Sequence, residues 1–365
     1  MSETNAKKVR EPLFHITKRA ALPFWKSTLI KVGGLLLGFL ISGILVSALT
    51  GKSPFALYAS LFKGNFGQEI RIWKLLRETA LLLGIGLALL PAFKMKFWNL
   101  GADGQVLMGA LVTAGLMYKL GPNANSAVVN ILMIAGSIAA GVIWAVIPAI
   151  FKAKFKTNET LFTLMMNYIA AGITGYMISI WATNGSGTMG TIKYAWLPKL
   201  GNDSLLTVIV AVLLTALMFV YLRFTKHGYE ISVVGESENT AKYIGINVEK
   251  VILRTLVLSG AICGLMGLLM AGSINHTISK TLVESRGFTA VLVVWLANFN
   301  PLYMVGTSFL IAFLQNGSSN VVTEFSLNDS SIASIITAVG IFCVIGCEFF
   351  IRYKFQLTKK KKEDK

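Results

Sequence analysis

The chain has 365 residues, of which 54% are hydrophobic and 14% are charged, and its mean hydropathy is +0.65. Because an ordinary soluble domain has about 25% charged residues, this composition excludes a soluble globular protein and predicts an all-α, polytopic membrane protein. The net charge of +17 does not indicate a nucleic-acid partner, since Lys and Arg stand in short segments between long apolar runs and not on one basic face.

Apolar runs long enough to cross a bilayer recur along the chain. A spanning helix needs about 20 mostly apolar residues. The runs that meet this length are 29–49, 97–118, 127–150, 159–182, 204–222, 251–272 and 329–350. A shorter run, 79–93, is separated from the next by Lys94 and Lys96, and the long run 288–316 is divided by Asn300-Pro301 into two short passes. We therefore expect about ten transmembrane helices, some of them short or broken.

Charge placement orients these passes, since Lys and Arg are in excess on the cytoplasmic side of membrane proteins. The basic segment 1–28 and the Lys-rich tail 351–365 both belong in the cytoplasm, which requires an even number of passes across the transmembrane domain 29–350. The same topology makes three connections cytoplasmic, namely 94–96, 151–158 and 223–250. The exception, RIWKLLRE at 71–78, falls on the outer side, and we interpret it as an amphipathic helix on the membrane surface.

The interior of the predicted spans is nearly free of charge, so an ion relay is not expected and a neutral polar solute suits the pathway better. Polar or aromatic residues at membrane depth are the candidates for contacting it, and the alternative for each is packing or a hydrogen bond between helices. Thr163 and Asn167 share a helical face, and Trp295 with Asn298 offers a stacking surface and an amide for a nucleobase or a sugar. The candidates are Asn99, Asp103, Gln105, Thr163, Asn167, Tyr168, Trp295 and Asn298.

The stretch WNLGADGQ, which interrupts two apolar runs, predicts a broken helix. Gly101 and Gly104 let the backbone leave the helix, and Asn99 and Asp103 are good caps for a helix N-terminus. Because Asp103 follows Lys96 closely, it lies near the cytoplasmic end of its span, where a carboxylate is tolerated. For Asp103 we therefore favour helix capping over contact with the solute.

The connection 223–250 is longer than the joining of two helices requires. Its centre, 236–243, predicts a short helix that Asn239 or Ser237 caps and Gly245 ends. Such a helix, held outside the bilayer between two spans, is able to press on a partner and pass motion to the spans. The alternative is an ordinary solvated loop, and the residues alone leave both interpretations open.

Five segments occur in the order and spacing of permease subunits of ABC importers, in the branch of branched-chain amino acid, simple-sugar and nucleoside permeases. The segments are NLGADGQ at 99–105, NETLFTLMMNYIA at 158–170, GYEISVVGESENTAKYIGI at 228–246, SGAICGLMGLL at 259–269 and GFTAVLVVWLANFNP at 287–301. The resemblance covers about residues 80–350, and the chain most resembles the BMP-type nucleoside permeases of Gram-positive bacteria.

The resemblance implies a subunit of the plasma membrane that forms, with a second homologous permease of ten helices, one translocation pathway for nucleosides. Its other partners would be a cytoplasmic ABC ATPase and an extracellular substrate-binding lipoprotein. ATP and Mg²⁺ would bind to the ATPase, so this chain is expected to bind no cofactor and no metal, and to be no enzyme. The residues implied for contact with the ATPase are Gly235, Glu236, Asn239, Ala241, Tyr243 and Gly245.

Two alternatives concern the transported solute and its driving force. A ribose- or galactose-like sugar permease would share the fold and differ in the lining of the pathway. Four residues depart from the family pattern and leave the identity of the solute open. They are Arg286, Trp295, Asn298 and Asn300. An ion-coupled secondary transporter would need buried charges along its path, which the predicted spans lack.

A search for catalytic groups finds no supported motif. Gly51-Lys52-Ser53 resembles the end of a phosphate-binding loop, but Val46 occupies the position where that loop needs a glycine. The three histidines are far apart in the sequence and predict neither a metal site nor a catalytic triad.

Overall fold

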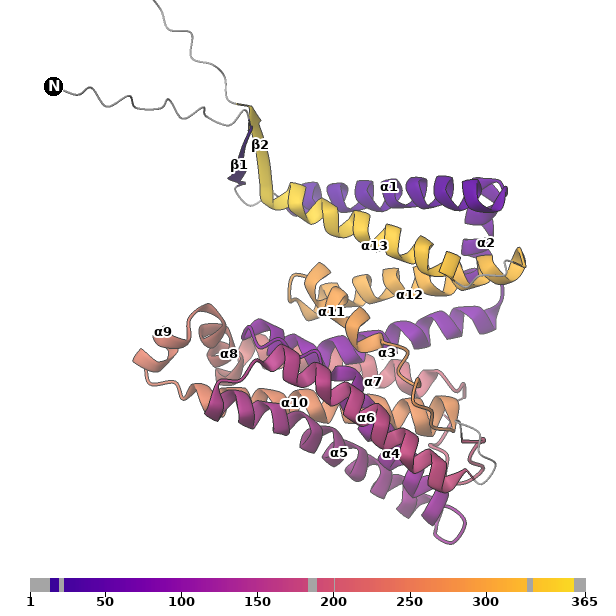
Figure 1. The fold of residues 1–365 in the computed structure, drawn as a ribbon, viewed down its shortest axis with the longest axis vertical. Coiled ribbons are helices and arrows are strands. Elements are labelled where there is room, and N and C mark those ends of the chain that lie inside the picture. Colours follow the sequence, from indigo (N-terminus) through magenta and orange to yellow (C-terminus); the bar gives the residue numbers. More distant parts are fainter. Residues whose placement is uncertain (1–13, 20–22, 183–188, 200, 327–330, 358–365) are drawn as a thin grey trace, which may run out of the picture. The chain divides into compact units, whose positions relative to one another are not determined.

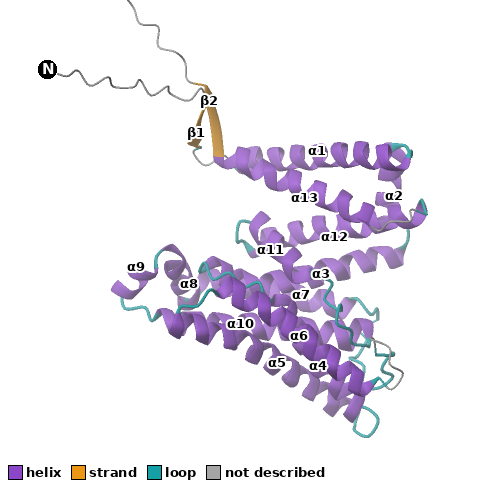
Figure 2. Ribbon diagram, in the orientation of Figure 1, coloured by secondary structure: helices purple, strands orange, loops and turns teal. Residues whose placement is uncertain are grey.

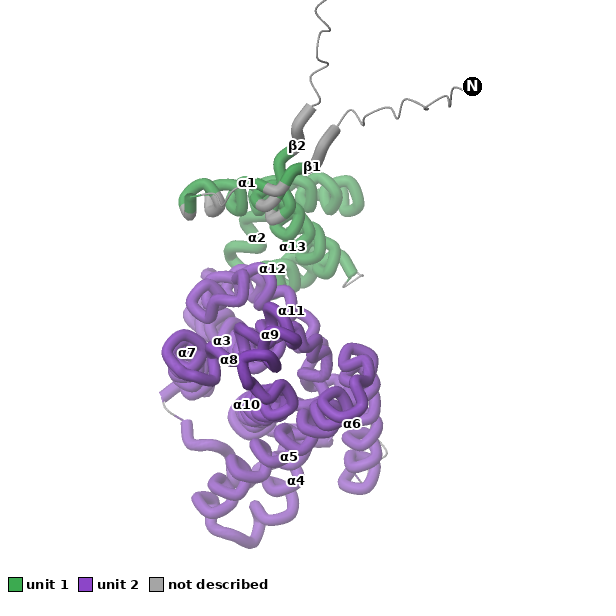
Figure 3. The backbone as a smooth tube through the Cα atoms, turned by 90° about the vertical axis from the view of Figure 1, so that its left-hand side faces the viewer, with its two compact units in different colours: residues 1–64, 314–365 green, residues 65–313 purple. Residues whose placement is uncertain are grey.

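The computed structural model describes residues 14–19, 23–182, 189–199, 201–326 and 331–357. Over these residues the chain is almost entirely helical (Figure 2), and the prediction of a helical protein with several membrane-spanning segments is confirmed. The helices form two compact units (Figure 3). Unit 1 comprises residues 1–64 and 314–365, and unit 2 comprises residues 65–313.

Unit 1 contains a pair of antiparallel helices. Its elements are β1 (Phe14–Lys18), α1 (Phe24–Thr50), most of α2 (Pro54–Phe66), the end of α12 (Pro301–Glu324), α13 (Ser331–Arg352) and β2 (Tyr353–Leu357). α1 and α13 approach closely because Gly34 of α1 leaves room for Cys347, and Gly38 leaves room for Cys343.

The two strands of unit 1 were not expected from the sequence. β1 pairs antiparallel with β2, with Phe14 opposite Leu357 and Lys18 opposite Tyr353. The all-α prediction is therefore wrong for these short segments. The pairing places the segment Phe14–Lys18 beside the segment Tyr353–Leu357.

Unit 2 is built around α10. Its elements are α3 (Glu69–Lys94), α4 (Ala102–Leu120), α5 (Ser126–Phe155), α6 (Glu159–Trp181), α7 (Leu205–Phe224), α8 (Lys226–Glu236), α9 (Glu238–Tyr243), α10 (Val248–Leu268) with its π-helical continuation η1 (Leu269–Asn275), α11 (Arg286–Leu296) and the start of α12. α10 packs against α3, α4 and α5 (Figure 1). Gly260 faces the backbone of Gly141, and Gly264 faces that of Ser137, so a side chain at either glycine would force α10 and α5 apart.

α3 differs from its prediction. We expected 71–78 to form a separate surface helix and 79–93 to form a short pass, but one unbroken helix covers both segments. No glycine or proline stands between Glu69 and Leu83 to interrupt it, and Pro91 lies in its last turn. The helix is buried from Thr79 onward, so the prediction of two separate segments was wrong.

Seven of the described helices are long and apolar enough to cross a membrane. They are α1, α3, α5, α6, α7, α10 with η1, and α13. The other predicted passes correspond to α4, α11 and α12, which are shorter or less apolar than this criterion requires. A total of about ten passes stays a prediction.

Candidate functional site

The broken helix predicted at WNLGADGQ is present. α3 ends at Lys94, α4 begins at Ala102, and residues 97–101 are not helical. The predicted span 97–118 therefore begins later than expected. The side-chain oxygen of Asn99 accepts hydrogen bonds from Gly101 N at 3.0 Å and from Gln105 Nε2 at 3.3 Å.

Asn99 also fastens this connection to the central helix. Its amide nitrogen donates to Ser259 Oγ of α10 at 3.3 Å. Asn99 and Gln105 are both buried, so their polar groups serve the connection between α3 and α4.

α6 holds the other side of the same connection. Thr163 Oγ1 accepts a hydrogen bond of 3.1 Å from Leu100 N. Asn167 accepts one of 2.8 Å from Gly104 N and donates one of 2.8 Å to Leu100 O. The predicted shared face of Thr163 and Asn167 is confirmed, and both side chains satisfy backbone groups that the helix break leaves free.

Asp103 caps a helix other than its own. α4 has Gly101 at its N-cap, with no side-chain hydrogen bond there. Asp103 Oδ1 instead accepts a hydrogen bond of 2.7 Å from Gly287 N in the first turn of α11. A carboxylate at that position interacts favourably with the free amides and the dipole of α11.

Arg286, the first residue of α11, joins two carboxylates beside this cap. Its guanidinium lies 2.7 Å from Glu78 Oε2 of α3 and 3.0 Å from Glu284 Oε2. The Glu78 and Arg286 side chains are 15% and 17% exposed. Charged groups of α3 and α4 thus hold the start of α11, which the sequence did not predict.

A cavity of about 280 Å³ lies beside the cap. It brings together three of the predicted pathway residues, Asp103, Asn167 and Tyr168. The other polar residues of its wall come from the segment 280–285, which leads into α11; they are Lys280, Thr281, Glu284 and Ser285. We did not single out this segment from the sequence, although four of its six residues are polar.

The predicted pathway residues Trp295 and Asn298 lie elsewhere. Trp295 packs against Trp98 in a tilted arrangement with ring centroids 5.4 Å apart, and the Trp98 ring lies 5.3 Å from that of Phe93. Asn298 lines a different cavity, with Lys94 and other residues at the ends of α3 and α7. Neither Trp295 nor Asn298 lines the 280 Å³ cavity.

The connection 223–250 contains two helices where we expected one. α9 matches the predicted helix, and Ser237, one of the two proposed caps, accepts a hydrogen bond of 3.2 Å from Thr240 N. Gly245 follows α9 with φ of +84°, a conformation that favours glycine and ends the helix. α8 was not predicted; two of its eleven residues are Gly228 and Gly235, and glycine has a low helix propensity.

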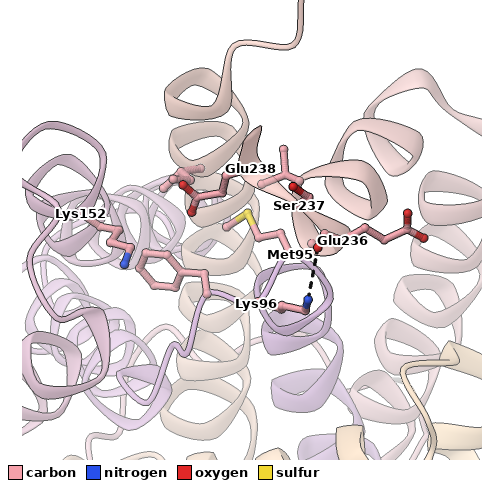
Figure 4. Close-up of a pocket in the computed structure, with 10 residues that line it drawn as sticks. Met95, Lys96, Lys152, Glu236, Ser237 and Glu238 are labelled. Carbon is pink, nitrogen blue, oxygen red and sulfur yellow. Dashed lines mark hydrogen bonds between the residues drawn. The ribbon is translucent and has the colours of Figure 1, made fainter. Parts of the chain in front are cut away.

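α8 rests directly on the end of α3. Gly235 faces the backbone carbonyl of Lys94, and any side chain at this position would collide with it. Lys96 Nζ donates a hydrogen bond of 3.5 Å to Glu236 O (Figure 4). A cavity of about 140 Å³ at this junction is lined by residues that include Met95, Lys152 and Ser237.

α8 is also tied to α10. Glu230 accepts a hydrogen bond of 2.8 Å from Arg254 of α10, and this bond holds the pKa of the Glu230 carboxyl below its usual range. His227 and Lys226 lie 3.7 Å and 4.0 Å from the same carboxylate. α8 is therefore bound both to the end of α3 and to the start of α10.

α9 exposes most of its side chains to solvent. Tyr243 is 92% exposed, and Glu236 and Asn239 are exposed as well, whereas Ala241 is buried and Gly235 is buried against the end of α3. The six residues implied by the resemblance thus divide into an exposed surface and a buried support.

The chain matches a known protein family over most of its length. The family model described as branched-chain amino acid transport system / permease component matches residues 72–345.

Three relatives are similar over nearly the whole chain. A guanosine ABC transporter permease protein of Bacillus subtilis is 29% identical over 345 residues, which cover 91% of this chain and 97% of that protein. A glucose ABC transporter permease protein of Haloferax volcanii is 26% identical over 352 residues, 92% of each chain. A nucleoside ABC transporter permease protein of Lactococcus lactis subsp. cremoris is 25% identical over 349 residues, 92% of this chain and 94% of that protein.

Proposed function

Because the chain belongs to the branched-chain amino acid transport system / permease component family, we propose that it forms the nucleoside pathway of an ATP-binding cassette importer. It is a transport subunit and not an enzyme. A separate ATPase binds Mg²⁺ and ATP and hydrolyses the ATP. The observation that supports the proposal is the close contact of Gly235 with the backbone carbonyl of Lys94. Lys94 is the last residue of α3, directly before the broken connection.

The contacts of α8 provide a route for coupling. A push on α9 moves α8, which touches the end of α3 at Gly235 and the start of α10 through Glu230 and Arg254. α10 also holds the connection that follows α3, through the hydrogen bond between Asn99 and Ser259. Motion of α8 thereby changes the connection that positions the first turn of α4, including Asp103.

The 280 Å³ cavity supplies the chemistry expected of a pathway for a neutral polar solute. Asp103 and Asn167 offer acceptors and an amide donor, while the Tyr168 ring is 68% exposed. Ribose hydroxyls and base edges need such hydrogen-bonding groups, and an aromatic ring stacks on a nucleobase. Its size is near the lower end of the about 300–1,000 Å³ typical of small-molecule sites, and a second permease facing it would enlarge it.

Guanosine or a related nucleoside is our preferred solute because two of the three relatives described above are named as guanosine or nucleoside permeases. The second candidate is a simple sugar, which the glucose permease relative supports. A sugar needs the polar groups of the cavity but makes less use of a flat aromatic face than a base does.

The binding side of each partner is inferred from the helix ends that lie close together. Segments that we expect in the cytoplasm meet at one cavity, since Lys96, Lys152 and Glu236 all line it. The ABC ATPase would bind α9 there, and the substrate-binding lipoprotein would dock on the opposite, extracellular side. The paired β1 and β2 fit N- and C-termini that share the cytoplasm.

Uptake in cells tests the proposal. A strain that lacks other nucleoside carriers and this gene should fail to accumulate labelled guanosine, and the plasmid-borne gene should restore accumulation. Labelled ribose is the parallel substrate. Restored ribose uptake without guanosine uptake would replace the nucleoside assignment by the sugar one.

The ATPase contact is tested separately by co-purification. Tyr243→Ala should lose the ATPase, whereas Tyr176→Ala, which removes another exposed tyrosine ring from α6, should retain it. Equal retention of the ATPase by both variants would contradict the assignment of α9.

A further inference from the structure

A basic cavity of about 680 Å³ opens between the C-terminal ends of α3 and α7 and the start of α12. Its wall contains three cationic side chains, Lys94, Lys96 and Arg223, and no carboxylate. We propose that this cavity binds the phosphate group of an anionic phospholipid at the membrane surface.

The charges of the wall favour an anion. Lys94 ends α3 and Arg223 lies in the last turn of α7, so two helices bring cations to the same opening. Asn300 adds an amide whose oxygen accepts a hydrogen bond of 3.0 Å from Leu302 N, which leaves its nitrogen as a donor. Cations and amide donors without a competing carboxylate are the groups that bind phosphate.

The rest of the wall favours a lipid over a free anion. Three rings, Phe93, Phe219 and Phe299, line the cavity beside the cations. The Arg223 guanidinium lies 5.6 Å from the centroid of the Phe219 ring and 5.9 Å from that of the Phe224 ring, so cation–π contacts with both rings position it. A lipid headgroup at a bilayer surface meets this same combination of groups.

The outer face of α7 provides a surface for the acyl chains. Leu213, Leu217, Val220 and Phe224 are exposed apolar side chains that lead along the helix to Arg223. Leu217 is 64% exposed. A phospholipid with its phosphate at Arg223 would therefore lay its chains along an apolar helix face.

One cation of the cavity also contacts the connection between α7 and α10. Lys96 Nζ donates to Glu236 O at the end of α8. A phosphate bound at Lys96 would thus act next to α8 and α9. The proposal concerns a lipid and does not depend on which solute the chain transports.

Lipid competition on the full-length chain tests the proposal. The purified protein in a neutral detergent is mixed with equal amounts of phosphatidylglycerol and phosphatidylcholine that have the same acyl chains, and bound lipid is counted by native mass spectrometry. A cation near a membrane surface contributes about a fivefold preference for an anionic lipid. The combined Lys94→Gln and Arg223→Gln variant should therefore lower the preference for phosphatidylglycerol by about 25-fold.

Lys250→Gln is the matched control, since Lys250 is exposed and lies outside the cavity wall. It should keep the wild-type preference. If the double variant does not fold, Lys96→Gln alone should lower the preference about fivefold.

Three results would overturn the proposal. Equal binding of the two lipids by the wild type would exclude an anion site, and a loss of preference in Lys250→Gln equal to that of the double variant would indicate general surface charge. Displacement of phosphatidylglycerol by millimolar inorganic phosphate would show that a free anion, and not a lipid, occupies the cavity.

Discussion

Replacing Asp103 separates its capping of α11 from direct contact with the solute. Asp103→Asn keeps a side-chain oxygen for Gly287 N but removes the charge. A hydrogen bond to a charged group contributes about 1.5–3 kcal/mol and a neutral one about 0.5–1.5 kcal/mol, so this variant should lose about 1 kcal/mol of stability. Asp103→Ala leaves Gly287 N without its acceptor, which costs about 1–3 kcal/mol for an unsatisfied buried donor, and should be the more damaging change.

Thermal unfolding of the full-length protein and uptake of labelled guanosine measure the two effects. The expected order of unfolding temperature is wild type, Asp103→Asn, then Asp103→Ala, and Asp103→Asn should retain much of the uptake. Asp203→Asn is the control, because it removes a carboxylate from an exposed pair with Lys199. A variant Asp103→Asn that unfolds like the wild type but transports nothing would refute capping as the main role and indicate contact with the solute.

Three further substitutions test the role of the connection 223–250. Gly235→Val should separate α8 from α3 at a cost of about 1–3 kcal/mol and reduce uptake at normal membrane levels, measured against Gly172→Val, where the site is open. Tyr243→Ala should weaken ATPase binding at least tenfold in a titration with the purified ATPase, with unchanged unfolding temperature, because the ring is exposed. Arg254 lowers the pKa of Glu230, so the stabilisation from the ionised Glu230 should be complete above the ordinary glutamate pKa and be lost as the pH falls through the lower pKa of the folded state. Glu230→Gln should remove this pH dependence of stability in acid unfolding curves.

The sequence predicted well those features that depend on residues close together in the chain. The helix break after Lys96 follows from two glycines and two capping residues within a short stretch. α9 follows from Ser237 before it and Gly245 after it. The glycine conformation at Gly245 and the cap at Ser237 are both local, so no tertiary information was needed.

Features that depend on tertiary contacts were missed or assigned to the wrong partner. The cap made by Asp103 joins residues 184 positions apart, and no local rule points to Gly287. The pairing of Glu78 with Arg286 spans 208 positions. The continuity of α3 was missed for another reason, since we took the charges at 71–78 as a boundary although nothing in the backbone chemistry interrupts the helix there.

The contacts of the broken connection account for its two amide side chains, Asn99 and Gln105. α8 touches both α3 and α10, and Asn99 links the end of α3 to Ser259 of α10. An unbroken helix through this point would move as a rigid rod and leave α4 to follow α3. A non-helical segment held by hydrogen bonds to α6 and α10 can change its angle while its backbone groups stay satisfied. Under the proposed coupling, the break would let the first turn of α4, with Asp103, respond to α8 without moving the whole helix.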